Sequence, residues 1–275
     1  MEQMLQAPGF SLSKGSKEST PVLYVEVDGG SLLTDDGYKE TKLGRIFGGE
    51  QRAQVSSDNE GVEKRFELER SDFMAHLGNC DDFFERFDPL IKQHLKACPS
   101  ARMVVLADGA EWMANWVERS YPNAGIILDF YHVTEKLGEF GVMVFNSKTK
   151  RTEWIEERKE ELLNGKLNEV ITAIKAKAEG RKASIKAKAE AVTKYYENNR
   201  YRMKYDEYLA KGYCIGSGAI ESAISTVVQQ RCKLVGQRWT DRVQSVLNLR
   251  TAYKSGKQVQ IRQLIRKKMG LAIAC

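Results

Sequence analysis

The chain has 275 residues, with 43 Lys and Arg against 37 Asp and Glu, which gives a formal net charge of +6 at pH 7. Hydrophobic residues make up 42% of the sequence and charged residues 29%, which excludes wholesale disorder and allows a sizeable core. No apolar run approaches the roughly 20 residues that span a bilayer, so we expect no membrane partner. The N-terminus lacks the apolar segment of a signal peptide, so we expect a cytoplasmic protein.

The cysteines and histidines form no recognisable metal or disulfide pattern. The five cysteines are widely spaced, and the three histidines add no zinc-finger spacing. Free, buried thiols are the expected state, and the sequence leaves a catalytic Cys–His pair open.

The first third of the chain has the pattern of β-structure. Residues 1–20 are polar and predict a flexible leader. Val22–Gly30 alternates apolar and polar residues and ends in a Gly-Gly pair, which predicts a strand that stops there. Tyr38–Phe47 and Lys64–His76 are the candidate second and third strands, separated by the turn-prone stretch Gly48–Glu60. Three consecutive strands with short connections predict an antiparallel meander.

The spacing of the apolar residues changes after the predicted meander. Asp81–Leu95 carries apolar residues at helical spacing, which predicts an amphipathic helix. Arg102–Ala107 and Gly125–Leu128 are short apolar runs typical of buried strands, with a helix predicted at Glu111–Arg119 between them. Strands that alternate with helices are expected to be parallel. The predicted fold is therefore α/β, with a mixed sheet of three antiparallel strands followed by two parallel ones.

The rest of the chain is predicted to be helical. Residues 133–212 are charged and helical in pattern and form a predicted insertion, ended by the glycine-rich turn GYCIGSG. Ser217 is a plausible N-cap for a helix at Gly218–Val235. Further helices are predicted at Trp239–Tyr253 and Gln258–Met269.

Basic residues gather at the C-terminal end. The stretch from Arg250 to Cys275 contains no acid, which suits a polyanion such as DNA, although a solvated helix face is the plainer alternative. Its cations are Arg250, Lys254, Lys257, Arg262, Arg266, Lys267 and Lys268.

Three carboxylates stand out by their position. Asp28 and Asp108 are expected at the ends of the first and fourth strands, where open α/β sheets place their ligands. Glu221 falls in the first turn of the helix after the glycine turn. Hard divalent cations such as Mg²⁺ prefer oxygen ligands, and two such ions support phosphoryl transfer. Taken singly, each aspartate also fits a turn residue, and Glu221 fits an acid placed by the helix dipole.

Four stretches of the sequence resemble a known family. They are VEVDGG, LADGAEWM, ILDFYHVTEKL and CIGSGAIESAISTVVQQRCKLVGQRW. In this order they are similar to insertion-sequence transposases of the ISKra type, relatives of Mutator-like elements with the ribonuclease H-like core of DDE transposases. The resemblance runs from about Val22 to Lys254. It implies DNA strand cleavage and strand transfer by an enzyme with two Mg²⁺ or Mn²⁺ ions.

The resemblance also implies roles for single residues. Asp28 and Asp108 match the family's two metal-binding aspartates, and Glu221 matches its glutamate. Asp129 and His132 match an Asp-x-x-His motif. His132 then either contacts a phosphate or orients a carboxylate, with a purely structural histidine as the alternative, and Asp129 is an alternative metal ligand. The implied partners are transposon ends and target DNA, with a homodimer or larger assembly on the nucleoid.

The residues after Glu221 are candidates for DNA contact. Arg231, Lys233 and Arg238 can hold DNA phosphates, and Trp239 either stacks on a base or packs in the core. A cluster of tyrosines interleaved with basic residues fits a DNA-facing surface, but an ordinary amphipathic helix fits it better. These tyrosines are Tyr195, Tyr196, Tyr201, Tyr205 and Tyr208.

Family members carry a longer N-terminal region than the 20 residues seen here, so a truncated, catalytically silent DNA-binding remnant is one alternative. Another is a ribonuclease H-like nuclease or resolvase, although the large insertion favours a transposase. The expected parts are a leader at 1–20, the first part of the catalytic core at 21–132, the insertion at 133–212, core helices with Glu221 at 213–254, and a basic C-terminal helix at 255–275.

Overall fold

The computed structural model describes residues 21–49, 52–55, 65–68, 70–216, 218–240 and 242–270. For 52–55, 65–68, 218, 219 and 221 it describes the backbone alone. The leader expected at 1–20 and the N-cap expected at Ser217 lie outside the described residues.

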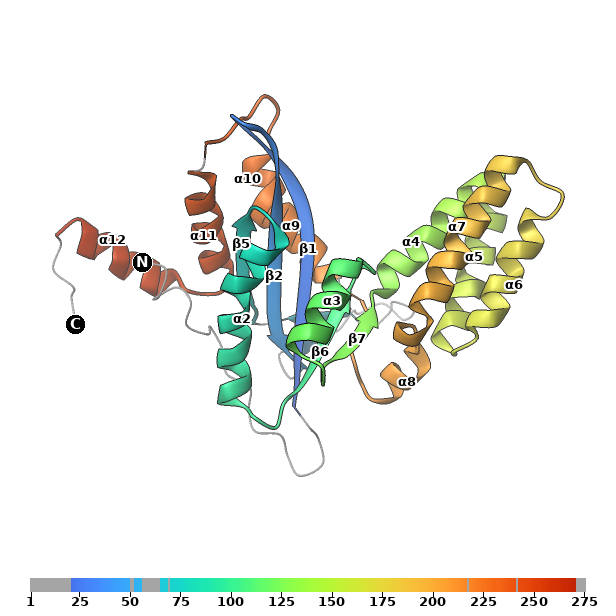
Figure 1. Cartoon of the computed structure of the whole chain (residues 1–275), viewed down its shortest axis with the longest axis horizontal. Helices are drawn as coiled ribbons and strands as arrows, with labels where there is room; N and C mark the ends of the chain where they lie inside the picture. The colour runs from blue at the N-terminus through green and yellow to red at the C-terminus, as the bar shows by residue number, and fades with distance from the viewer. Residues whose placement is uncertain are drawn as a thin grey trace. The chain divides into compact units, whose positions relative to one another are not determined.

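A five-stranded mixed sheet organises the fold (Figure 1). Its strands lie in the order β5-β2-β1-β6-β7, so the first strand is the neighbour of β6, as the sequence suggested. β1 pairs antiparallel with β2, and β2 pairs antiparallel with β5. This architecture confirms the predicted α/β class and is consistent with a ribonuclease H-like fold. The strands are β1 Val22–Thr34, β2 Gly37–Gly48, β5 Asp72–Leu77, β6 Arg102–Ala107 and β7 Gly125–Leu128.

Three details of the predicted meander were wrong. β1 does not stop at its Gly-Gly pair but continues to Thr34, because β2 pairs with it as far as Gly37 and supplies the missing hydrogen bonds. Gly37 has a φ of 101°, the left-handed conformation that a tight hairpin turn requires. The stretch Gly48–Glu60, predicted to be a turn, contains the strand β3 (Arg52–Val55). The predicted third strand Lys64–His76 is divided into β4 (Arg65–Leu68), which pairs antiparallel with β3 in a separate two-stranded ribbon, and β5, which belongs to the main sheet.

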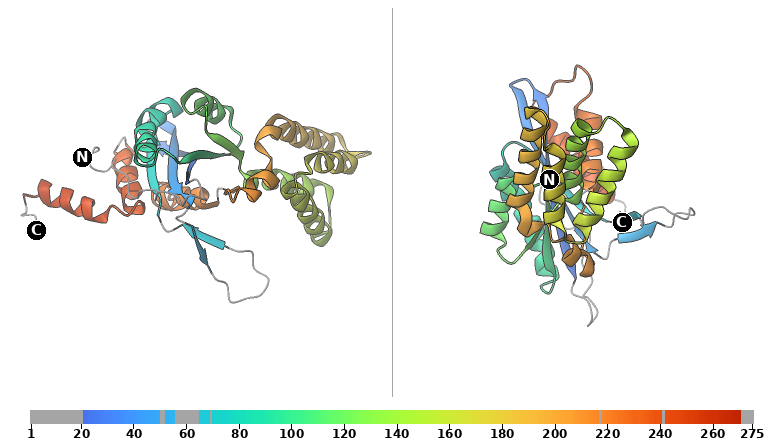
Figure 2. Two further views of the ribbon diagram at one scale, coloured as in Figure 1. Left: turned by 90° about the horizontal axis from the view of Figure 1, so that it is seen from below. Right: turned by 90° about the vertical axis from the view of Figure 1, so that its right-hand side faces the viewer.

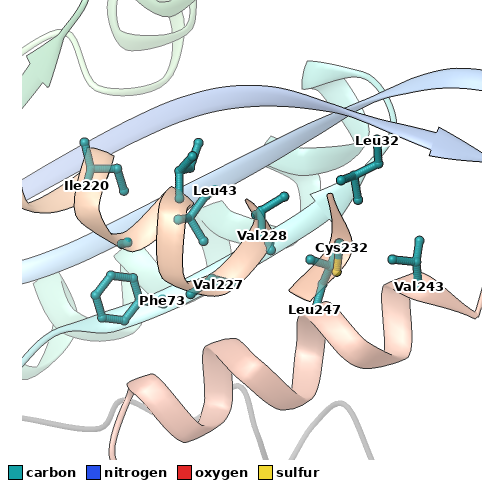
Figure 3. Packing of buried hydrophobic residues seen from close by; sticks show 12 residues of the cluster. Leu32, Leu43, Phe73, Ile220, Val227, Val228, Cys232, Val243 and Leu247 are labelled. Carbon is teal, nitrogen blue, oxygen red and sulfur yellow. The ribbon is translucent and has the colours of Figure 1, made fainter. Parts of the chain in front are cut away.

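Successive residues of β2 face opposite sides of the sheet. Leu43 belongs to an apolar cluster with Ile220 and Leu247, which lie on helices from the C-terminal part of the chain (Figure 3). A Cβ on the next residue, Gly44, would instead meet the rings of Phe83 and Phe87 on the opposite face. This is the period of two that a strand between two helical layers requires.

The first face is covered by a broken helix and by α11 (Figure 3). The single helix predicted at Gly218–Val235 is divided, because a π-helical turn, η3, interrupts the α-helical hydrogen bonds. α11 also closes the edge of β5, since the Gln244 side chain bonds the carbonyl of Ala75 and the amide of Leu77 at 2.9 and 2.7 Å. The elements are α9 Gly218–Ile224, η3 Ser225–Gln229, α10 Gln230–Cys232, α11 Val243–Lys254 and α12 Gln258–Lys268.

The second face is covered by α2 (Cys80–Ala97), as the left view of Figure 2 shows. Asn79 caps this helix, because its side chain accepts the amide of Asp82 at 2.8 Å. The buried side of α2 carries Phe83 and Phe87, which follow the helical period read from the sequence.

The chain divides into two compact units. The first comprises Met1–Val105, Asn123–Gly125 and Gly218–Cys275, and the second comprises Leu106–Pro122 and Ile126–Ser217. The second unit therefore contains the end of β6, most of β7 and the helical insertion. In the insertion, α4 packs against α5 and α7, and α6 packs against α5 and α7. The helical elements of this unit are α3 Glu111–Ser120, α4 Phe130–Val144, α5 Lys148–Leu163, α6 Leu167–Ala178, α7 Ala183–Asn199, η2 Arg200–Arg202 and α8 Tyr205–Ala210.

Candidate functional site

Asp108 lies in the loop between β6 and α3, directly after an apolar strand. Its carboxylate Oδ1 accepts the amide of Ala110 at 2.9 Å, so the loop's own backbone holds the side chain. Oδ2 takes no hydrogen bond from the described residues, and the Asp108 side chain is half-buried. Gly109 follows with a φ of 95°, a conformation that glycine adopts without strain.

Asp129 is the second carboxylate of this unit and is buried, with 1% of its surface exposed. It caps α4, because Oδ1 accepts the amide of Tyr131 at 3.1 Å. Its Oδ2 lies 2.7 Å from Nδ1 of His132. An ionised carboxylate only accepts, so in this contact Nδ1 donates its proton to Oδ2. This contact fits both the orienting histidine and the structural histidine that the sequence left open.

The two strand ends that carry these aspartates are joined directly. The amide of Asp129 donates to the carbonyl of Ala107, the residue before Asp108, at 2.8 Å. Within the second unit, Asp108 and Asp129 are therefore side by side at the ends of β6 and β7.

Three tyrosine hydroxyls hold the backbone around the two aspartates. Tyr195 donates to the carbonyl of Asp108 at 2.8 Å, and Tyr205 donates to the carbonyl of Leu128, just before Asp129, at 3.0 Å. Tyr196 donates to the carbonyl of Val133, in the first turn of α4, at 2.8 Å. Sequence analysis missed this role, because Tyr195 lies 87 residues from Asp108 and no spacing pattern connects them.

The tyrosines remain protonated donors. Burial raises the pKa of Tyr195 well above its ordinary value, and the nearby Asp108 and Asp129 carboxylates raise it further, against an opposing effect of Arg202. Burial likewise raises the pKa of Tyr205, with the Asp129 carboxylate among the additional causes. Tyr196 and Tyr205 are fully buried, Tyr195 is half-buried and Tyr201 is exposed, and they lie on α7, η2 and α8 rather than on the one amphipathic helix that the sequence favoured.

The glycine-rich turn that precedes α9 lies against Asp129. The amide of Phe130 donates to the carbonyl of Ile215 at 2.8 Å. A Cβ on Gly216 would stand 3.8 Å from Oδ1 of Asp129. The chain therefore passes directly beside the buried carboxylate before it enters α9.

Asp28 lies in the first unit, inside β1 rather than at a strand end as predicted. It is half-buried, pairs across the sheet with Leu43, and its Oδ1 accepts the amide of Gly29 at 2.6 Å. Glu26, two residues earlier on the same face, is buried and paired with Arg45 at 3.0 Å. A strand that extends past the aspartate displays the carboxylate from the middle of the sheet.

Glu221 lies in α9, and only its backbone is described. α9 packs on β1 and β2, and its neighbours Ile220 and Ile224 are buried, as the predicted apolar side requires. The following turn η3 is fixed by Arg250, whose Nε donates to the carbonyl of Val227 at 2.8 Å and whose Nη2 donates to that of Thr226. The carbonyls that π-helical winding displaces are thus satisfied by a charged donor.

The candidate DNA-contacting residues lie in and after α10. Lys233 and Arg238 are exposed, and the Arg231 guanidinium lies 5.3 Å from the centre of the Trp239 ring. The Trp239 indole donates to the carbonyl of Cys232 at 3.1 Å and packs against the apolar cluster of the first unit. Its packing role is therefore visible, and one ring face already carries a cation.

The basic C-terminal residues are not all available to a polyanion. Lys257 is buried, and its ammonium lies 3.4 Å from the carboxylate of Asp72, which also bonds His94 at 2.9 Å. Arg250 is committed to the backbone of η3. The exposed cations of α12 are Arg262, Arg266, Lys267 and Lys268.

The donor chemistry fits a hard divalent cation. Asp28, Asp108 and Asp129 offer carboxylate oxygens, the ligands that Mg²⁺ and Mn²⁺ prefer. Among the side chains that the structure describes, no group of three His, Cys, Asp or Glu residues is close enough to hold a metal, and the side chain of Glu221 is not among them. In the described part of the chain, Cys80, Cys98, Cys214 and Cys232 are free thiols.

The profile of a family described as an uncharacterised protein family, UPF0236, matches residues 4–268. No curated protein matches the chain. Within the described residues, no helix combines the length and apolar character needed to cross a membrane.

Proposed function

The chain belongs to the UPF0236 protein family, and from this premise we propose that it is the DDE-type transposase of an insertion sequence, similar to the ISKra type. In this proposal the protein cuts one DNA strand hydrolytically at an element end. The freed 3′-hydroxyl is then joined to target DNA. The proposed partners are DNA and further copies of this chain, assembled as a homodimer or larger complex on the nucleoid.

The observation that carries the proposal is the placement of three acids on three elements of a mixed α/β fold. Asp28 lies in the central strand β1, Asp108 follows β6, and Glu221 lies in α9. β1 and β6 are neighbours in the sheet. Two bound Mg²⁺ ions would activate the attacking oxygen and neutralise charge on the phosphate.

The chain's own residues have separate tasks in this chemistry. Asp28, Asp108 and Glu221 are the proposed ligands. Asp129, with His132 bonded at 2.7 Å, is a preoriented carboxylate that either adds a ligand or holds a water. Lys233 and Arg238 are exposed and contact DNA phosphates in this proposal, which makes binding sensitive to salt.

The test is divalent-metal-dependent nicking of supercoiled plasmid by the purified chain. We expect nicking with Mg²⁺ or Mn²⁺ and its loss in Asp28→Asn, Asp108→Asn and Glu221→Gln. A loss of about 100-fold or more is expected, since each 1.4 kcal/mol of lost stabilisation is tenfold in rate. Asp36→Asn is the matched control, because this exposed carboxylate in the β1–β2 turn pairs with Lys39 at 2.8 Å.

Each outcome separates the candidate functions. Salt-sensitive DNA binding without nicking would identify a silent binding remnant. Nicking without joining of 3′-ends to a target would identify a nuclease or resolvase. Nicking that survives in all three acid variants would refute the assigned metal ligands.

A further inference from the structure

The carboxylate of Asp108 is positioned by its own loop. Because Oδ1 is tied to the amide of Ala110 at 2.9 Å, the carboxylate moves with the backbone of residues 108–110. That backbone is held from outside by the hydroxyl of Tyr195, which donates to the carbonyl of Asp108 at 2.8 Å. A hydrogen bond from α7 therefore holds the carbonyl of the residue whose carboxylate is to be positioned.

We infer that Tyr195 is a positioning residue, through which the helical insertion holds Asp108 in its metal-binding orientation. The inference rests on the proposed function and adds to it a task for the insertion. Tyr195 does not touch the cation or the DNA in this scheme. It lowers the free-energy cost of ordering the loop when the cation binds.

The fit between Tyr195 and the loop is close on both sides. A Cβ on Gly109 would lie 2.7 Å from the Tyr195 hydroxyl and 2.9 Å from its ring, so the hydroxyl fills the space beside the glycine. The Lys136 ammonium lies 4.7 Å from the centre of the tyrosine ring. A cation from α4 therefore lies against the ring, and the hydroxyl is directed at the carbonyl of Asp108.

Tyr195 is less buried than the other two tyrosines that hold the backbone near the aspartates, so it can be substituted with less risk to the fold. Tyr196 and Tyr205 are fully buried, whereas Tyr195 is half-buried. Replacement by phenylalanine keeps the ring and removes the hydroxyl alone. Tyr208, whose hydroxyl lies 3.4 Å from the carbonyl of Tyr201, supplies a control for loss of a hydroxyl in the same region.

The experiment compares the parent, Tyr195→Phe and Tyr208→Phe in the full chain. Hydrogen exchange of the Ala110 amide reports the order of the loop without metal. Electron paramagnetic resonance titration with Mn²⁺ reports affinity, and the Mn²⁺ concentration for half-maximal nicking reports function. Melting temperatures accompany each variant, and Gly109→Ala, whose Cβ displaces the same hydroxyl from the other side, is the second variant.

We expect Ala110 exchange in Tyr195→Phe to be about tenfold faster and Mn²⁺ binding about five- to tenfold weaker, the range that loss of one hydrogen bond allows. The nicking rate at saturating Mn²⁺ stays within about twofold of the parent, a split that a general loss of structure would not give. Tyr208→Phe keeps the parent's exchange and affinity.

The failure of this inference is separable from the failure of the proposed function. If the parent binds Mn²⁺ and nicks DNA, but Tyr195→Phe matches it in exchange and affinity, the positioning role alone is wrong. If the parent binds no Mn²⁺, both proposals are wrong. If the melting temperature of Tyr195→Phe is much lower than that of Tyr208→Phe, the Gly109→Ala variant decides. An unchanged Mn²⁺ affinity in folded Gly109→Ala would then overturn the inference.

Discussion

A Cβ atom on Gly109 would lie 2.7 Å from the hydroxyl oxygen of Tyr195, closer than real side-chain contacts allow. Gly109 also has a φ of 95°, where a side chain is strained. Gly109→Ala should therefore lower the free energy of unfolding by about 1–3 kcal/mol, through overpacking and backbone strain. Urea denaturation measures the change.

Gly138→Ala is the control for this substitution. Gly138 lies in α4 of the same unit, and a Cβ there would meet nothing within 4 Å. Alanine is preferred to glycine in a helix by about 1 kcal/mol, so this variant should be slightly more stable than the parent. Equal effects of the two alanines would contradict the close contact at Gly109.

Gly44 sets the distance between the sheet and α2. A Cβ there would stand 2.5 Å from the ring of Phe87 and 2.8 Å from that of Phe83. Both rings are fully buried, so Gly44→Ala must push α2 away, and we expect a loss of about 1–3 kcal/mol in stability. Gly30→Ala, on the neighbouring strand with open space around it, should change stability by less than about 1 kcal/mol. Thermal melting of both variants checks the comparison.

The strands that sequence analysis located best are the ones with no competing signal. Arg102–Ala107 and Gly125–Leu128 were predicted with the bounds that the structure has, because each is an apolar run with a sharp polar end. β1 was predicted too short, since a Gly-Gly pair resembles a turn unless the pairing partner is known. β3 was missed because its four residues lie in a stretch rich in turn-forming residues, and β4 was joined to β5 in one predicted strand, Lys64–His76.

The residues of the candidate site likewise differ in how well the sequence predicts them. Asp108 could be singled out by its place at a strand end, and Asp129 and His132 by the family resemblance. The hydroxyl bonds of Tyr195 and Tyr205 could not, since they join segments that only the tertiary fold brings together. The Asp28–Asp108–Glu221 metal set remains a prediction.

The buried ion pair beside Asp28 makes a stability prediction. Nη1 of Arg45 lies 3.0 Å from Oε2 of Glu26, and both side chains are almost fully buried. Glu26→Gln leaves the buried guanidinium without its counter-charge, so we expect a loss of about 3–5 kcal/mol. Glu156→Gln breaks a pair with Lys159 at 2.7 Å in which neither side chain is buried, and it should cost less than about 1 kcal/mol. Chemical denaturation with equal losses for both variants would count against the buried pair's role.

His76 on β5 makes the stability of the chain depend on pH. Burial lowers the pKa of His76 below its ordinary value of 6.5, the Arg86 guanidinium lowers it further, and the Asp82 carboxylate opposes them. Neither ring nitrogen has a hydrogen-bond partner among the described residues, and Nε2 lies 4.0 Å from the Asp82 carboxylate. At pH values above 6.5 the folded state therefore holds His76 mostly as the neutral imidazole.

The sign of the effect follows from proton linkage. Below pH 6.5 the unfolded chain takes up a proton at His76 more readily than the folded chain, so stability falls as the pH drops through this value toward the lower folded pKa. Urea unfolding at pH 7.5 and at pH 5.5 should show a larger loss of stability for the parent than for His76→Gln, which has no group to protonate there. The carboxylates and the other histidines are the same in both proteins. The difference between the two losses of stability is therefore the contribution of His76. Equal losses would mean that the buried imidazole accepts its proton without cost, and that the Asp82 carboxylate compensates for the burial.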